Sequence, residues 1–342
     1  MGVPILHQTD LFHPHADPDD HWDLACVYAL ALAGDYDLRG VLIDHPPTFL
    51  DVAPDVMAVA QMNVITGLAA PVAVGSSVMV RTRGEGIATL PSADRAGVEF
   101  VLRLLAEAPE PVVISIVGSC RDITLAGVTD PALFKAKCRA VYLNAGSGTR
   151  QPEQLGEAEY NVALNPAAYA GIFDLPCPVY WMPCFELTPP RWQVEEFGTF
   201  YRFAQSEILP HLSPRVQGFF AYMLGRSPST DWLGALRNPP DAAALAAFGA
   251  LERNMWCTGG FLHATGRTVT VDGDIVPLAE AGDRAVFTFD PITAACADDG
   301  IVRWSPAAAP GDPARHIFHV RDRERYAAAM TKAMRTLLAT LP

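Results

Sequence analysis

Short apolar runs alternate with longer amphipathic segments through the first half of the chain. Segments with a helical period lie at residues 19–34, 49–67 and 92–109, the first ending at Gly34 and the third capped by Ser92. Strands that alternate with helices favour a mostly parallel sheet with helices on both faces, which is a doubly wound α/β fold. The apolar runs have the length of strands and lie at residues 3–10, 37–44, 71–75, 110–118, 138–146 and 177–184.

The second half of the chain has a less regular pattern. Residues 190–265 are rich in Trp and Phe and are predicted to be mostly helical. The stretch GRTVTVDGDIVPL at residues 266–278 predicts a small β-hairpin that turns at Asp272-Gly273. The remaining patterns predict a strand followed by a helix, and then a terminal amphipathic helix, at residues 283–300 and 321–341.

The residues directly after the predicted strands are expected to converge on one crevice, because ligands bind at the carboxyl ends of strands in such folds. Within residues 6–25, LHQTDLFHPHADPDDHWDLA, the acidic side chains are unusually dense. Carboxylates this close repel one another unless a cation or several donors lie among them, and their hard oxygens suit Ca²⁺ or Mg²⁺. Alternatively, they only cap the following helix, whose N-terminus favours negative charge. The positions after strand ends are Asp10, Asp44, Gly75, Gly118 to Asp122 and Asn144 to Gly148.

Charge and cysteine usage narrow the classes of partner. With 25 basic and 38 acidic residues the formal charge is −13, and no stretch rich in Lys or Arg occurs, which argues against nucleic acid or an anionic membrane as partner. Seven Cys without CxxC spacing are typical of reduced core cysteines in a cytoplasmic protein. We find no signal peptide, no apolar run long enough to span a bilayer, and no linker within residues 1–342, so a single domain is expected.

Several motifs, in order, resemble those of the calcium-dependent nucleoside hydrolases of the inosine–uridine type. Gln8-Thr9-Asp10 ends a strand and Asp19-Asp20 opens a helix, as in the N-terminal signature of that family. The chain is therefore identified as a divergent member of the family, with the fold that this implies. Further similar stretches are PVAVG at 71–75, VGSCRDITLAG at 117–127, VYLNAGSG at 141–148, EAEYNVALNPAA at 157–168, FELTPP at 185–190 and FDPITAA at 289–295.

The resemblance implies hydrolysis of the N-glycosidic bond of a small riboside, in a homodimer or homotetramer. Asp10 would also activate a Ca²⁺-bound water, and carboxylates would stabilise the oxocarbenium-like transition state. The large aromatic residues include Trp192, and among them Trp232 or Trp256 in the irregular second half is the better candidate for stacking on the base, and His263 is a candidate to approach it. The resemblance places Ca²⁺ on the carboxylates of Asp10, Asp20 and Asp290 and the backbone carbonyl of Arg121, and the ribose on Asp19, Asn144, Glu159 and Asn161.

The chain departs from the family pattern at four places. The loop at residues 11–18 is longer than usual and carries His13 and His15. Phe289 stands where many members have the His that protonates the leaving base, and Phe cannot supply that proton. His45, His13, His15 and His263 are the candidates to replace it. The other two departures are Asp44-His45 in place of Gly-Asn, and Ser119, Cys120, Arg121 and Asp122 in place of Pro-Leu-Thr-Asn.

Three functions therefore stay open at the level of the sequence. The first is a Ca²⁺-dependent N-ribosyl hydrolase. The second is a nucleoside-hydrolase-like protein that has lost this activity and binds a ribose-containing ligand, or that hydrolyses a different substrate. The third is a metal-dependent phosphohydrolase, which lacks support because no basic or Gly-rich phosphate cradle accompanies the acidic residues.

Overall fold

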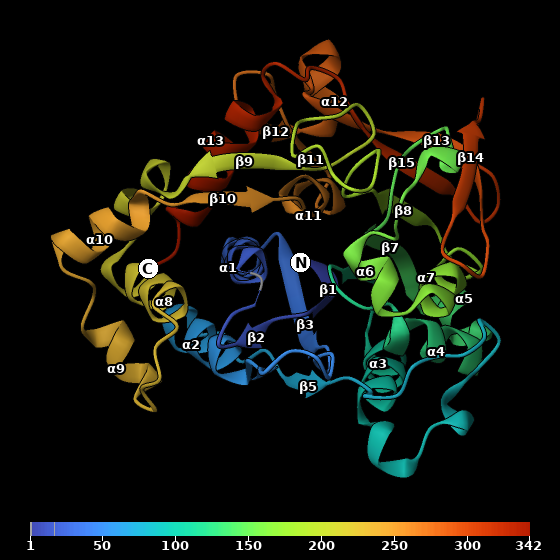
Figure 1. The fold of residues 1–342 in the computed structure, drawn as a ribbon, viewed down its shortest axis with the longest axis horizontal. Coiled ribbons are helices and arrows are strands. Elements are labelled where there is room, and N and C mark those ends of the chain that lie inside the picture. The colour runs from blue at the N-terminus through green and yellow to red at the C-terminus, as the bar shows by residue number, and fades with distance from the viewer. Residues whose placement is uncertain (1, 17) are drawn as a thin grey trace.

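A nine-stranded sheet runs through the middle of the molecule (Figure 1). The computed structural model describes residues 2–16 and 18–342, so Met1 and Asp17 of the acidic stretch lie outside the described residues. The strands of the sheet follow one another in the order β14 (Val302–Pro306), β13 (Phe287–Cys296), β15 (Arg315–Val320), β8 (Val179–Met182), β7 (Cys138–Asn144), β6 (Val112–Ile116), β1 (Val3–Thr9), β3 (Tyr36–Ile43) and β5 (Val72–Val74).

Most of this sheet is parallel, as the alternation of strands and helices predicts. The seven neighbouring strands from β15 to β5 run in one direction, whereas β13 is antiparallel to both β14 and β15. The central strands β1, β6 and β7 are buried along almost their whole length. Strands covered on both faces need apolar residues at consecutive positions, which explains why the sequence shows apolar runs here instead of alternation.

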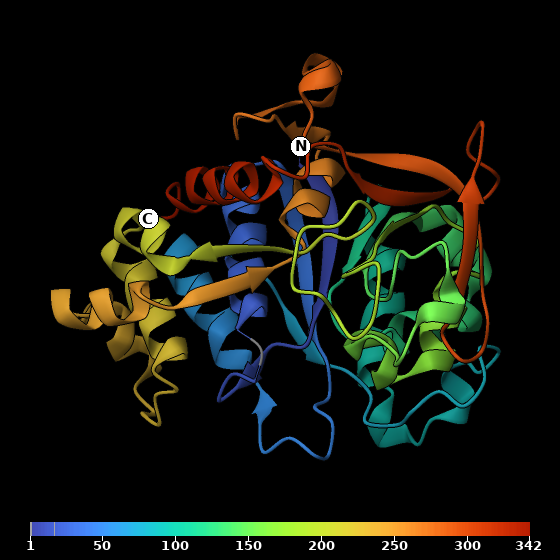
Figure 2. The same ribbon diagram turned by 45° about the horizontal axis from the view of Figure 1, so that its top comes forward.

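Helices cover both faces of the sheet and enclose one hydrophobic core on each side (Figures 1 and 2). Consecutive residues of β1 serve the two cores, Ile5 on one side and Leu6 on the other. The first core is built with α1 (Asp19–Leu32), α2 (Val56–Thr66), α8 (Pro214–Leu224), α11 (Thr258–Ala264) and α13 (Tyr326–Leu338). The second core is built with α3 (Ala96–Glu107), α4 (Arg121–Thr129), α5 (Pro131–Lys137) and α7 (Pro166–Ile172).

The second half confirms the predicted hairpin and the terminal helix. Strands β11 (Arg267–Val269) and β12 (Ile275–Pro277) pair antiparallel, and Gly273 has a φ of 79°, which a turn of this kind favours in glycine. The predicted terminal helix is α13. The short helices of this half are α6 (Tyr160–Leu164), α9 (Trp232–Arg237), α10 (Ala242–Gly249) and α12 (Leu278–Ala281).

Residues 190–265 are less helical than the sequence predicts. They contain an antiparallel ribbon of β9 (Tyr201–Ala204) and β10 (Glu252–Met255) in addition to helices. Tyr201 and Phe203 are buried while Arg202 between them is exposed, which is the period of a strand. The edge of the Phe203 ring packs on Trp22 of α1 at 5.2 Å between centroids, so the ribbon lies over the helix that follows the acidic stretch.

The segment at 283–300 forms a long strand, and the predicted helix after it is absent. β13 pairs with β15 up to Pro291 and with β14 from Ile292 onward. Proline has no backbone N–H, and it lies at the point where the strand changes its partner. Asp290 is consequently in the middle of a strand and not at the start of a helix.

Two helices begin later than predicted. α2 begins at Val56, where the Asp55 side chain accepts from the Ala58 N–H, and not near residue 49. α3 begins at Ala96, because Ser92 opens a short 3-10 turn instead of capping the helix. Within the described part of the chain, no helix is long and apolar enough to cross a membrane.

Candidate functional site

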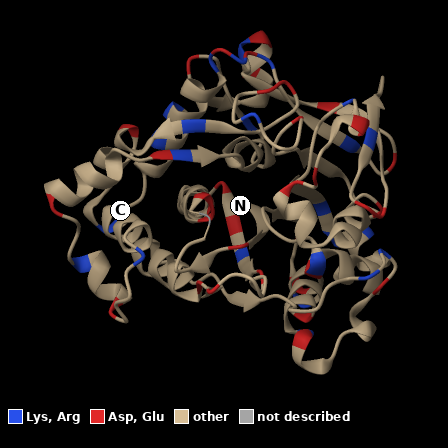
Figure 3. Cartoon of the chain, viewed as in Figure 1, with Lys and Arg blue, Asp and Glu red and all other residues tan. Residues whose placement is uncertain are grey.

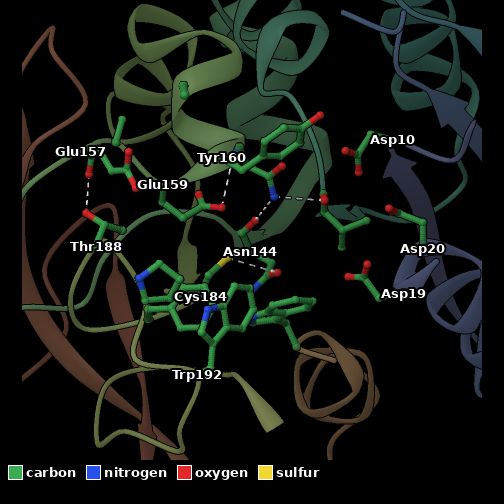
Figure 4. Close-up of a pocket in the computed structure, with 17 residues that line it drawn as sticks. Asp10, Asp19, Asp20, Asn144, Glu157, Glu159, Tyr160, Cys184, Thr188 and Trp192 are labelled. Carbon is green, nitrogen blue, oxygen red and sulfur yellow. Dashed lines mark hydrogen bonds between the residues drawn. The ribbon is translucent and has the colours of Figure 1, made fainter. Parts of the chain in front are cut away.

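A cavity of about 400 Å³ lies at the carboxyl ends of β1, β6 and β7 (Figure 4). This is the edge of the sheet where the sequence predicts a crevice. Among the described residues that line the cavity, none is Lys, Arg or His. Its polar lining consists of Asp10, Asp19, Asp20, Asn144, Glu157, Glu159, Asn161 and Thr188, and its aromatic lining of Tyr160, Phe185, Trp192 and Trp256.

Three carboxylates form one side of the cavity. Asp10 directly follows β1, and Asp19 and Asp20 are in the first turn of α1, where negative charge is favourable. The Thr9 hydroxyl donates to Oδ1 of Asp20 at 2.5 Å and orients that carboxylate. Asp10 and Asp20 are almost completely buried. The predicted Asp10, Asp19 and Asp20 are thus brought together, and Figure 4 shows their carboxylates on the same side of the cavity.

Residues 12 and 13, between these carboxylates, are held against the rest of the molecule. Strand β2 (Phe12–His13) within the long loop pairs with β4 (Ala53–Pro54). The His13 ring stacks on Tyr222 of α8, and its Nδ1 lies 3.9 Å from the Asp55 carboxylate. The described part of the loop therefore packs on α2 and α8, and neither His13 nor His15 lines the cavity.

The floor beneath Asp10 requires glycine at position 118. A Cβ added to Gly118 would meet Oδ2 of Asp44 at 2.6 Å and both the backbone N and the Cβ of Asp10 at 3.0 Å. The Asp44 carboxylate accepts from the Ser119 N–H at 2.5 Å and from the Gln8 amide. Burial raises the pKa of Asp44 well above its usual value, which favours a neutral group beside Asp10.

The opposite side of the cavity is the start of α6. Glu159 caps this helix by accepting from the N–H groups of Asn161 and Val162, and it also accepts from the Gly146 N–H at 2.7 Å. Burial raises the pKa of Glu159, and the three N–H donors oppose that shift. The Asn161 amide donates to the carbonyls of Val117 and Asn144, at 3.2 and 3.1 Å. Glu159 and Asn161 are therefore tied to the ends of β6 and β7.

Asn144 is held by four polar contacts. Its Nδ2 donates to the Met182 carbonyl at 2.8 Å and lies 3.0 Å from the Thr199 hydroxyl. Its Oδ1 accepts from the thiols of Cys184 and Cys257, at 3.7 and 3.3 Å. The side chain lines the cavity in an orientation that the protein alone determines.

Aromatic rings form one wall of the cavity. Phe185 lies between Trp192 and Trp256, with centroid distances of 5.3 and 6.0 Å, and Phe200 packs behind them. Trp192 has a φ of 53°, a conformation that is uncommon for a bulky residue and that recurs at ligand sites. Of the two predicted candidates for base stacking, Trp256 lines the cavity, whereas Trp232 at the start of α9 does not.

Several side chains that line the cavity are not among the predicted site residues, namely Glu157, Tyr160, Phe185, Thr188 and Trp192. Glu157 and Tyr160 lie within the motif quoted above, so their proximity to Glu159 was a usable signal. Trp192 is one of several large aromatic residues that could stack on a base, but the sequence does not single it out, because its position depends on the path of an irregular loop. Thr188 is fixed there by its hydroxyl, which donates to the Glu157 carbonyl. This hydrogen bond joins the segment around residue 188 to the segment around residue 157, and both segments line the cavity.

Two of the predicted metal ligands lie elsewhere. Oδ2 of Asp290 is 2.6 Å from Nδ1 of His319, and Oδ1 accepts from the Thr288 hydroxyl at 2.8 Å. Arg121 opens α4, and its guanidinium donates to the Ser119 hydroxyl and to the His45 carbonyl. Neither residue lines the cavity, and for Asp290 the reason is the continuous strand β13. We leave both out of the site.

His263 and Phe289 belong to an aromatic cluster and not to the cavity. Their ring centroids are 4.4 Å apart, and Tyr142 and Tyr180 complete the cluster. The Tyr142 hydroxyl lies 2.8 Å from Nδ1 of His263. Burial lowers the pKa of His263 to about 4, so the ring is neutral at pH 7. Phe289 consequently does not occupy a position beside a ligand in this cavity.

The buried histidines predict how stability depends on pH. Burial lowers the pKa of His7 to about 3 and that of His263 to about 4, against about 6.5 in the unfolded chain. The unfolded chain therefore binds more protons between pH 6.5 and 4, and the free energy of unfolding falls as the pH is lowered through that window. In H263Q we expect this fall to be smaller by about 3 kcal/mol.

Urea unfolding at a series of pH values measures this difference between H263Q and the wild-type protein. The exposed His211 provides the control, because H211Q should reproduce the wild-type pH dependence. An unchanged pH dependence in H263Q would show that the pKa of His263 does not differ between the folded and unfolded states, and would contradict the prediction.

Asp10, Asp19 and Asp20 form the acidic side of the cavity, and their carboxylate oxygens suit a hard divalent cation as ligands. Asp10, Asp19 and Asp20 offer only oxygen, and Ca²⁺ takes six to eight oxygen ligands, several of which are often water. The described residues contain no group of three or more His, Cys, Asp or Glu side chains already arranged around one point. These carboxylates would thus supply part of the coordination, with oxygens of substrate and water for the rest.

Comparisons of the fold find nucleoside hydrolases among similar structures. No protein-family model matches the sequence, and no curated protein matches it. The effector protein XOO4466 is similar with a TM-score of 0.56 at 13% identity, over 99% of this chain and 94% of the other. The type III effector protein XopQ complexed with adenosine diphosphate ribose gives 0.52 at 14%, over 99% and 95%. The purine-preferring ribonucleoside hydrolase from Gardnerella vaginalis gives 0.50 at 16%, over 98% and 99%.

Proposed function

We propose that this chain, which has the nucleoside-hydrolase fold, hydrolyses the N-glycosidic bond of a small riboside. One observation carries the proposal. Asp10, Asp19 and Asp20 face Glu159 and Asn161 across a single cavity of about 400 Å³, which is large enough for a riboside. Opposed carboxylates suit a reaction in which positive charge develops between them.

The bond breaks through a ribosyl cation, as in the hydrolysis of other glycosides. Asp10 takes the proton of the attacking water, because it is buried at the end of β1 within the acidic side. Asp19 accepts hydrogen bonds from the ribose hydroxyls and orients the ring. Glu159 and Asn161 hold the sugar from the other side, and the negative charge of both sides stabilises the transition state. Trp256 and Trp192 cover the leaving base.

Asp10 and Asp20, with Asp19 beside them, would hold Ca²⁺. When bound, a hard divalent cation supplies electrostatic activation of the nucleophile and a second anchor for the ribose hydroxyls. The protein residues position both the riboside and the attacking water. The test for the cation is calorimetric titration of the folded protein with Ca²⁺, compared with the variant D20N, in which binding should weaken at least about tenfold.

Hydrolysis of p-nitrophenyl riboside tests the proposed function directly. The p-nitrophenolate leaves without protonation, so turnover needs only the sugar site and the nucleophile. We expect release of p-nitrophenolate that depends on added Ca²⁺ and stops with a chelator. A folded, Ca²⁺-loaded protein that releases none would refute the proposal.

A second candidate is a protein that binds a ribose-containing ligand without hydrolysing it. The absence of His, Lys and Arg from the described lining favours it, because none of these side chains is present to protonate a leaving base. Binding of ribose by calorimetry, with no turnover of p-nitrophenyl riboside, is the result that would support this candidate.

We propose further that the chain is a single domain that forms a homodimer or homotetramer in the cytoplasm. The seven cysteines are buried free thiols, which supports a reducing compartment. Light scattering of the purified protein measures the oligomeric state.

A further inference from the structure

The cavity is negatively charged at both ends. Asp10, Asp19 and Asp20 lie on one side, and Glu157 and Glu159 lie on the other (Figure 4). No described lining residue carries a positive charge, and the proposed Ca²⁺ would offset charge only on the side of Asp10, Asp19 and Asp20, which leaves the side of Glu157 and Glu159 acidic. Figure 3 shows acidic positions at the helix that Figure 1 labels α1. Phosphate groups are repelled in such surroundings, whereas a cationic ligand is attracted.

Among the described lining residues, none is a His, Lys or Arg that could protonate a leaving base. Both oxygens of Glu159 accept from backbone N–H groups, at 2.7 Å from Gly146 and 3.1 Å from Asn161. The Cys184 thiol, which also lines the cavity, is directed to Oδ1 of Asn144. A neutral purine or pyrimidine leaves slowly without a proton from a general acid.

One wall of the cavity is aromatic. Trp192 and Phe185 lie 5.3 Å apart, and Trp192 is 48% exposed, so one ring is accessible from the cavity mouth. Figure 4 shows Trp192 on one wall and Tyr160 on the opposite one. A cation against the face of a Trp ring is stabilised by the ring quadrupole, most strongly where water is excluded. Acidic groups beside aromatic rings are the surroundings that organic cations prefer.

These three observations converge on one class of substrate. We propose that the substrate is a riboside whose base carries a positive charge, such as an N-ribosyl pyridinium or an N7-alkylated purine riboside. The inference rests on the proposed N-ribosyl hydrolase function. Trp192 and Phe185 bind the cationic ring, and the carboxylate of Glu157 at the mouth attracts it.

A cationic base removes the need for a general acid. When the bond between C1′ and the ring nitrogen breaks, its electron pair moves to the ring and neutralises the positive charge, so the base leaves as a neutral molecule. Water adds to C1′ and gives its proton to Asp10. The products are ribose, the neutral base and one proton, so atoms and charge balance.

Guanosine and 7-methylguanosine are the matched probes, because they differ by one methyl group and one positive charge. We expect kcat/KM to be at least about 100-fold higher for 7-methylguanosine in the wild-type protein. In W192L the ratio of the two kcat/KM values should fall by about 3- to 30-fold, and in W192F it should stay within about 3-fold of the wild-type ratio. In E157Q it should fall by about 2- to 5-fold, and less at high salt.

The controls separate this inference from the proposed function. Glu153 is exposed and does not line the cavity, so E153Q should leave the ratio unchanged. Turnover of p-nitrophenyl riboside with a ratio near one, or with a ratio that W192L and E157Q do not alter, overturns the inference and leaves the hydrolase function intact. A ratio that neither W192L nor E157Q alters would mean that the kinetics report only the intrinsic lability of the bond to the cationic base. If neither probe nor p-nitrophenyl riboside is hydrolysed, the proposed function itself fails.

Discussion

The substitution D10N is expected to lower kcat for p-nitrophenyl riboside by about 10²- to 10⁴-fold, because it removes the proposed base. Asn is nearly isosteric with Asp, so the cavity keeps its shape. The loss should appear in kcat and not mainly in KM, since the base acts in the transition state. Steady-state kinetics with Ca²⁺ at saturation measure both parameters.

The thermal stability of D10N, unlike its activity, should not fall. Asp10 is buried on the same side of the cavity as Asp19 and Asp20, and neighbouring like charges repel one another. In the absence of Ca²⁺, D10N should therefore unfold at the same or a higher temperature than the wild-type protein. The half-buried Asp37, which pairs with Arg39 at 3.3 Å near the start of β3 and does not line the cavity, provides the control. D37N should keep full activity. A D10N protein with activity within tenfold of wild type would exclude Asp10 as the base.

The substitution G118A is expected to lower kcat/KM by at least about 100-fold, because it displaces Asp10. The added Cβ would lie 3.0 Å from the backbone N of Asp10 and 2.6 Å from Oδ2 of Asp44. The contact with backbone cannot be relieved by a change of rotamer, so the end of β1 must move. Overpacking of this kind costs about 1–3 kcal/mol of folding free energy. Kinetics and urea unfolding of the same variant measure the two effects.

Gly84 provides the matched control for this substitution. A Cβ added at Gly84 meets nothing within 4 Å, and its φ is outside the left-handed region. G84A should therefore match the wild-type protein in both measurements. Wild-type activity in G118A would show that the position of Asp10 is not critical, and would contradict the role that we propose for it.

Much of the fold follows from the chain pattern, because the central strands are apolar on both faces. A strand covered on both sides must be apolar at consecutive positions, and such runs are visible in the sequence. The hairpin at Asp272-Gly273 was also predictable, because its turn requires a residue that tolerates positive φ. The ribbon of β9 and β10 was not, because its two strands are far apart in the chain.

The acidic side of the cavity was also predictable from local sequence. Asp10 follows a strand and Asp19 and Asp20 open the next helix, so connectivity alone places them near one another. The motif around Glu159 and Asn161 faces them because β6 pairs parallel with β1 and β7 pairs parallel with β6. Parallel strands bring their carboxyl ends to one edge of the sheet, whatever the sequence distance between them.

The sequence by itself determined the parallel sheet and the carboxylates at its edge, because both depend on strand order and on residues next to strand ends. Only the tertiary structure decided which long-range candidates reach the cavity. Pro291 lies where β13 passes from one partner strand to another, so Asp290 stays in a strand and Phe289 joins His263 in an aromatic cluster. Trp192 reaches the cavity through a loop with a positive φ. Pairing and packing over many residues fix these positions, and no local pattern encodes them.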